Sequence, residues 1–155
     1  MDFLPVSVWY GPERSRAPMV TKIHNVKKVR DDIIQIKELG FNSIRFWYDL
    51  LAGEPKPNEW DFETIETLLS ITDELGLKVL VQVYTDSAPS WVATEYPDSL
   101  FVDRSGLKIE TQASPGVCSD HPVVQKHISQ FLENLAKVVS KHTSFYAWDI
   151  WSEPH

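Results

Sequence analysis

Short apolar runs alternate with longer segments of helical periodicity along this chain of 155 residues. Four apolar or aromatic runs bounded by glycine, proline or polar residues predict buried strands, at residues 3–10, 41–47, 77–84 and 146–151. Three segments with apolar residues three or four positions apart predict helices, at residues 26–39, 62–75 and 122–142. The first two of these segments stop at Gly40 and Gly76, because glycine readily adopts the conformation that ends a helix.

A longer excursion follows the third predicted strand. Residues 88–97 are typical of a short helix, and residues 102–109 predict a hairpin with its turn on a Ser-Gly pair. Before the second helix, residues 55–61 form a loop whose last residue, Asp61, is suited to cap that helix. Strand–helix alternation with right-handed crossovers predicts a parallel α/β sheet covered by helices.

Composition narrows the possible partners. With 43% hydrophobic and 24% charged residues, the chain has material for one globular core, so one domain over residues 1–155 is expected. A formal charge of −7 with scattered basic residues argues against nucleic acid, whose binding needs clustered cations. The single cysteine, Cys118, cannot form an internal disulfide, and neither a signal-peptide pattern nor a run of about 18 apolar residues occurs. We therefore expect a soluble, cytoplasmic chain with no membrane partner.

The segment 147–155 is the most informative for chemistry. A Trp-rich apolar run delivers Glu153 to a proline turn, at the carboxyl end of the fourth predicted strand. Parallel barrels present catalytic groups at that end of their strands. Apolar and aromatic walls raise the pKa of a carboxyl group by desolvation, which suits a general acid. Glu153 is therefore the first candidate for catalysis, and an ordinary surface carboxylate is the alternative.

Three segments carry a resemblance to a known family. Residues 40–45, 88–97 and 148–154 occur in the same order as in the (β/α)8-barrel glycoside hydrolases. Together they resemble the first half of the β-galactosidases of glycoside hydrolase family 42, and the last one also resembles the Asn-Glu-Pro motif of the wider retaining clan. The resemblance implies a TIM-type (β/α)8 barrel, of which only the first four strands and about three helices are present. It also implies retaining hydrolysis of terminal β-D-galactosides or related β-glycosides.

The resemblance assigns roles to three residues. Glu153 matches the general acid/base, and the nucleophile would be a Glu after the seventh strand, supplied outside this chain. Arg45 matches an arginine that holds the nucleophile by charge-assisted hydrogen bonds, with a surface salt bridge as the alternative. Ser152 stands where the family usually has an Asn that donates to the sugar 2-hydroxyl. A serine also donates one hydrogen bond but reaches less far.

Aromatic side chains near the predicted strand ends are candidates for stacking against a sugar, although each is alternatively a core residue. They are Tyr10, Trp47, Tyr84, Trp91 and Trp151. Cys118 aligns with a zinc ligand of some family members, but its partner cysteines would lie beyond residue 155, so neither a metal nor another cofactor is expected. Pro115 replaces an arginine that touches substrate in the family.

Size sets the remaining constraint. A complete barrel needs about 250 residues, so this chain supplies at most four strand–helix units and its outer strands keep open edges. We expect these edges to pair with a C-terminal half barrel or with a second copy of the chain. Three hypotheses stay open: the first half of a β-glycosidase that is inactive alone, a non-catalytic carbohydrate-binding module, and a self-associating half-barrel fragment.

Overall fold

A computed structural model describes residues 3–13, 15, 20 and 22–150 of the chain. Its sheet has four parallel strands, in the order β1 (Ser7–Trp9), β2 (Ser43–Asp49), β3 (Lys78–Tyr84) and β4 (Phe145–Asp149). In the described part of the chain the helices are α1 (Val26–Glu38), α2 (Leu50–Gly53), α3 (Glu63–Leu75), α4 (Ser90–Glu95) and α5 (Pro122–Val139). The predicted parallel α/β architecture is confirmed.

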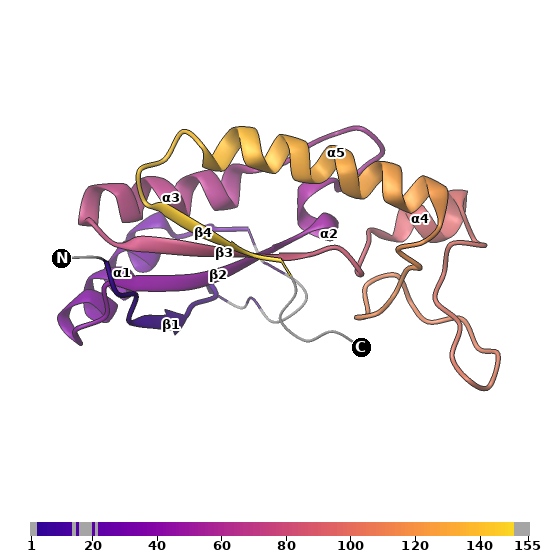
Figure 1. Ribbon diagram of the computed structural model, residues 1–155, viewed down its shortest axis with the longest axis horizontal. Coiled ribbons are helices and arrows are strands. Elements are labelled where there is room, and N and C mark those ends of the chain that lie inside the picture. The colour runs from indigo at the N-terminus through magenta and orange to yellow at the C-terminus, as the bar shows by residue number, and fades with distance from the viewer. Residues whose placement is uncertain (1–2, 14, 16–19, 21, 151–155) are drawn as a thin grey trace.

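The long helices cover one face of the sheet, here called the outer face. Figure 1 shows α3 and α5 on the same side of the strands, with α4 and the excursion after it beyond the strands' carboxyl ends. The outer face supplies the core, because Phe46 and Tyr48 of β2 are buried and Tyr48 stacks on Phe131 of α5 at a centroid distance of 6.4 Å. Every second strand residue therefore points to the opposite side, here called the inner face.

Local signals explain where the helices begin and end. Asn25 precedes α1, and its side chain accepts a hydrogen bond from the Lys28 amide. Gly76 ends α3 in the left-handed conformation, with φ at 71°. Phe62 occupies the N-cap position of α3, so Asp61 lies one residue earlier than expected and accepts instead from the Glu63 amide at 3.2 Å.

Several predicted boundaries are corrected by pairing. Only Ser7–Trp9 of the predicted strand 3–10 is a strand paired with β2, because a strand extends only as far as its backbone is in register with a partner. The hairpin turn predicted for residues 102–109 is confirmed: Val102 and Lys108 form an antiparallel bridge, and the Asp103 amide donates to the Leu107 carbonyl oxygen across the turn. The short helix α2 was not predicted, and it begins where the Asp49 side chain accepts from the Ala52 amide.

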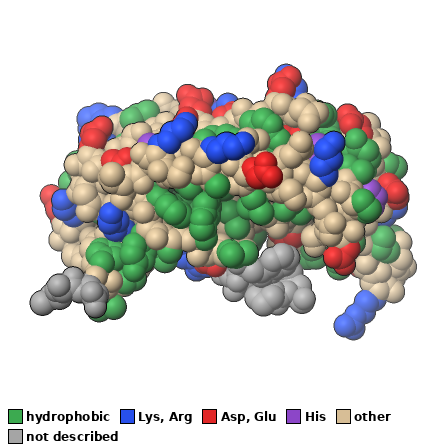
Figure 2. Space-filling model, turned by 45° about the horizontal axis from the view of Figure 1, so that its top comes forward, with side chains coloured by type: hydrophobic (Ala, Val, Ile, Leu, Met, Phe, Trp, Pro, Cys, Tyr) green, Lys and Arg blue, Asp and Glu red, His purple; other side chains and the backbone are tan. Residues whose placement is uncertain are grey.

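An apolar groove stays open between α5 and β4. It encloses about 240 Å³ and is lined by Val83, Leu132, Ala136, Trp148 and Ile150. Figure 2 brings the α5 side of the molecule forward and shows hydrophobic side chains gathered near its middle. Trp148 is 37% exposed and Ile150 is 72% exposed, which leaves a surface suited to cover by another apolar element.

Candidate functional site at the carboxyl ends of the strands

Three register partners form one row across the inner face. Trp47 of β2, Gln82 of β3 and Asp149 of β4 lie side by side in the sheet. Partners in register point to the same side, so the three side chains share the inner face. The row is at the carboxyl ends of the strands, where parallel α/β folds place their sites.

An ion pair bridges β2 and β4 across the inner face. The Arg45 guanidinium lies 2.6 Å from the Asp149 carboxylate, and the two side chains are 34% and 26% exposed. Arg45 stands two residues before Trp47, so it belongs to the same face of β2. The pair keeps the guanidinium at the strand ends through charge-assisted contact. Sequence reasoning selected Arg45 but missed Asp149, which is within the same motif as Glu153.

Trp47 is buried rather than available for stacking. It is 2% exposed, and its ring lies 4.5 Å from the ring of Trp9, which is 52% exposed. The backbone of Gly11 also approaches Trp47 closely, because a Cβ atom at Gly11 would come within 2.6 Å of Cη2 of the indole. Trp9 therefore offers the open aromatic surface on this face, and sequence reasoning missed it.

The row carries two buried polar atoms that lack a hydrogen-bond partner within the described residues. They are Nε1 of Trp47 and Oε1 of Gln82, which is 1% exposed. Folded proteins satisfy the great majority of such atoms. Gln82 was not predicted as a site residue, and its position between Val81 and Val83 in a mostly apolar strand is the sequence signal that could have found it.

The end of β2 carries a second acid. Asp49 is fully buried and accepts hydrogen bonds from the Val20 amide at 3.1 Å and the Ala52 amide at 2.6 Å. Burial raises the pKa of Asp49 to about 7, although both hydrogen bonds act in the opposite direction. Tyr84 is its register partner on β3 and is half-buried, so this predicted residue lies at the same strand ends.

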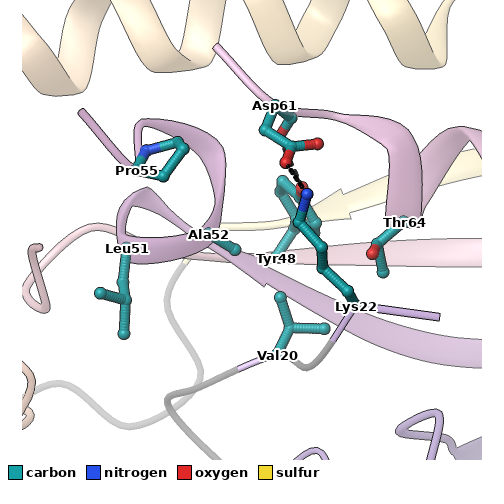
Figure 3. A pocket seen from close by; sticks show the side chains of 8 residues that line it. All are labelled: Val20, Lys22, Tyr48, Leu51, Ala52, Pro55, Asp61 and Thr64. Carbon is teal, nitrogen blue, oxygen red and sulfur yellow. Dashed lines mark hydrogen bonds and ion pairs between the residues drawn. The ribbon is translucent and has the colours of Figure 1, made fainter. Parts of the chain in front are cut away.

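A small pocket adjoins α2 and the start of α3. Figure 3 shows Lys22 reaching across it to Asp61, whose carboxylate lies 2.5 Å from the Lys22 ammonium. Tyr48 donates to the Asp61 carbonyl oxygen at 2.7 Å and closes the floor. The pocket encloses about 210 Å³. Lys22 is the only cation among the described residues that line the pocket, and it is already paired with Asp61.

The structure places two other predicted residues away from the row. The structure corrects the predicted position of Tyr10 at the site. Its hydroxyl donates to Asp32 of α1 at 3.2 Å, and its side chain is 8% exposed on the helix side. Trp91 of α4 donates to the Glu54 carbonyl oxygen at 3.1 Å. Its ring centroid lies 5.1 Å from that of His127, and His127 is hydrogen-bonded to the buried Glu54 carboxylate at 2.9 Å. Trp91 thus anchors the excursion to the body of the protein.

Asp86 holds the rest of the excursion against the end of β3. Its carboxylate accepts from the Ser114 hydroxyl at 2.7 Å, and its carbonyl oxygen accepts from the amides of Gly116 and Val117. Gly116 must remain glycine here, because a Cβ atom would lie 2.4 Å from the Thr111 carbonyl oxygen. The segment around Pro115 is therefore packed tightly on the strand end.

The remaining predicted residues, Trp151, Ser152 and Glu153, lie outside the described residues. Their roles stay predictions. Cys118 is a free, half-buried thiol. The described ranges hold no cluster of three or more His, Cys, Asp or Glu suited to a metal ion. Within the same ranges, no helix has the length and apolar character needed to cross a membrane.

The comparisons with known proteins agree on one family. Residues 21–155 match the glycoside hydrolase family 42 model, described as β-galactosidase. β-Galactosidase bgaB of Geobacillus kaustophilus is 27% identical over 100 residues, which are 64% of this chain and 15% of that protein. A β-galactosidase of Thermus thermophilus is 30% identical over 113 residues, or 70% of this chain and 17% of that protein. The chain thus spans less than a fifth of the length of these relatives.

Solved structures show the same fold. The β-galactosidase of the psychrophilic Marinomonas ef1 superposes with a TM-score of 0.78 at 19% identity, over 97% of this chain and 22% of that one. The cold-adapted β-galactosidase of Rahnella sp. R3 gives a TM-score of 0.71 at 23% identity, over 82% of this chain and 19% of that one. The four strands and their helices correspond to a small part of each chain, as expected of a half barrel.

Proposed function

Because this chain belongs to glycoside hydrolase family 42, the β-galactosidase family, we propose that residues 1–155 form the N-terminal half of a retaining β-glycosidase barrel. The reaction is hydrolysis of terminal β-D-galactosides or related β-glycosides. Glu153 donates a proton to the leaving oxygen and later activates water, while a carboxylate outside this chain attacks the anomeric carbon. The curated β-galactosidases among its relatives support this substrate class.

The main support for the proposal is the geometry of the inner face at the carboxyl ends of the strands. Arg45 of β2 and Asp149 of β4 are paired there, and Asp149 is the last residue of its strand, four positions before Glu153. The chain therefore leaves the sheet toward Glu153 at the end where parallel barrels hold their catalytic groups.

The described residues suggest a division of labour. Arg45, held by Asp149, keeps a permanent positive charge beside the position of the second carboxylate and favours its ionised form. Trp9, half exposed on the inner face, presents an apolar ring for the C–H side of a sugar. Tyr84 lies at the neighbouring strand end, and Ser152 supplies one hydrogen bond next to the acid.

A second polypeptide segment completes this arrangement in our proposal. β1 and β4 each have one neighbour among the described strands, and the groove between α5 and β4 exposes Trp148 and Ile150. A C-terminal half barrel would pair with the open edges and cover this groove. A second copy of the chain is the alternative occupant. Location in the cytoplasm stays a proposal that rests on the single, free cysteine.

Two measurements on the purified chain test the proposal. Hydrolysis of an aryl β-D-galactoside is expected to be absent, because one carboxylate of the pair is missing, whereas calorimetry should detect binding of D-galactose. Absence of sugar binding would favour the self-associating fragment. Hydrolysis that persists in Glu153→Gln would contradict the role given to Glu153. Hydrolysis lost in that variant would mean that a second copy supplies the missing carboxylate.

A further inference from the structure

Two neighbouring residues of the inner face carry a buried donor and a buried acceptor that have no partner in the described part of the chain. These groups are the indole N–H of Trp47 and the side-chain carbonyl oxygen of Gln82. Their residues are 2% and 1% exposed. Since folding removes both groups from water, each destabilises the fold unless something else binds it.

The position of these two polar atoms argues that they are not a defect in packing. Trp47 and Gln82 are register partners, so both project from the face that carries the Arg45–Asp149 ion pair. The outer face of the same strands is apolar, with Phe46 and Val81 fully buried. The unsatisfied atoms are therefore confined to the side of the sheet that faces the candidate site.

The chemistry of the pair matches one kind of ligand group. A hydroxyl accepts one hydrogen bond and donates another, so it satisfies an N–H and a carbonyl oxygen together. A carboxylate or phosphate would satisfy Trp47 but repel the carbonyl oxygen of Gln82. Arg45 and Asp149 on the same face are paired with each other, so an uncharged polyhydroxy ligand suits this part of the face.

We propose that Trp47 and Gln82 bind one hydroxyl group of a pyranose, with Gln82 as a residue that sets substrate specificity. This inference rests on the proposed glycosidase function and extends it to a residue outside the predicted site. It also changes the role of Trp47, whose ring is covered by Trp9 and whose contribution is the N–H group.

The test replaces Gln82 by methionine, which has a similar length and no amide. If the amide serves the ligand, Gln82→Met binds D-galactose about tenfold more weakly or worse in calorimetry, the factor for one hydrogen bond. Its thermal midpoint stays equal or rises, because an unsatisfied buried acceptor has been removed. A fall in the midpoint would show that the amide has a structural partner and would overturn the inference.

Gln130 provides a matched control. It lies on α5, and its Oε1 atom is also buried without a partner in the described residues. Gln130→Met is expected to leave the thermal midpoint equal or higher and to bind D-galactose as the unchanged chain does. A similar loss of binding in both variants would trace the effect to general packing and would overturn the role of Gln82.

Deoxygalactoses identify the hydroxyl without any risk to folding. One of the 2-, 3-, 4- and 6-deoxy sugars should bind the unchanged chain about tenfold more weakly than D-galactose but lose nothing further in Gln82→Met. Additive losses for all four sugars would overturn the inference. If the unchanged chain binds no galactose, the proposed function fails together with it. If Gln82→Met binds as well as the unchanged chain, only the inference fails.

Discussion

The buried carboxyl group of Asp49 should make the stability of this fold fall as pH rises from 5 to 8. Its pKa is raised from 3.8 to about 7, chiefly by burial. Between these values the folded chain binds a proton that the unfolded chain has released, so the free energy of unfolding decreases with increasing pH. Above pH 7 the carboxylate is ionised in both states and the decrease levels off.

The size of the effect follows from the shift. About three pKa units at 1.36 kcal/mol each correspond to roughly 4 kcal/mol at alkaline pH. Part of this loss of stability has already occurred at pH 5. The same linkage therefore predicts that the free energy of unfolding decreases by about 2.5 kcal/mol between pH 5 and pH 8. The hydrogen bonds from Val20 and Ala52 partly offset the desolvation of the carboxylate and are already included in the raised pKa.

Asp49→Asn isolates this contribution. The amide cannot ionise, so its free energy of unfolding should lack the decrease of about 2.5 kcal/mol between pH 5 and pH 8. Urea titrations at constant ionic strength, followed by circular dichroism, measure the difference. The Asn side chain still accepts from one backbone amide but presents its NH₂ group to the other, so the absolute stability shifts by about 1–3 kcal/mol at all pH values.

Asp61→Asn is the control for surface carboxylates. Burial acts to raise the pKa of Asp61, but hydrogen bonds from Lys22 and the Glu63 amide outweigh it and lower the pKa. The stability that Asp61 contributes is present above pH 4 and is lost below it, so its removal should leave the slope between pH 5 and pH 8 unchanged. Parallel curves for the unchanged chain and Asp49→Asn would refute the reasoning about Asp49.

Two further predictions concern packing. His127→Leu leaves the fully buried Glu54 carboxyl group without its imidazole hydrogen-bond partner and should lower the free energy of unfolding by about 1–3 kcal/mol. A smaller loss when both residues are replaced would confirm that the cost comes from the unpaired buried group. Gly53→Ala would place a Cβ atom 2.4 Å from Cε2 of Phe131, so we expect a loss of about 1–3 kcal/mol in urea unfolding. Partial recovery in the double variant with Phe131→Leu would confirm the clash, and no recovery would contradict it.

Element type was predictable where a local rule was strong. The apolar run 77–84 and the helical stripe from residue 122 appear as β3 and α5, because their periodicity depends on neighbours in sequence. The limits of β1 were not predictable, since they depend on how far β2 pairs with it. Tyr10 illustrates the same limit. Trp9 and Tyr10 are both aromatic, and only the position of α1 decides which of them packs under a helix.

The candidate site divides in the same way. The sequence motif at residues 148–154 and the segment around Arg45 identified the family, and the family match confirmed it. The same motif contains Asp149, but its pairing with Arg45 depends on a contact between residues 104 positions apart. Gln82 was missed because one polar residue in a mostly apolar strand does not indicate a site until its register partners are known.

The sequence by itself determined the strand–helix alternation, the α/β class and the family, because these follow from periodicity and short motifs along the chain. Tertiary structure alone decided which face of each strand meets the helices. It thereby placed Trp47, Gln82 and Asp149 in one row, and it buried Asp49 beyond the reach of water. The physical reason is that burial, pKa and hydrogen-bond satisfaction depend on neighbours in space, and strand pairing brings those neighbours from distant parts of the chain.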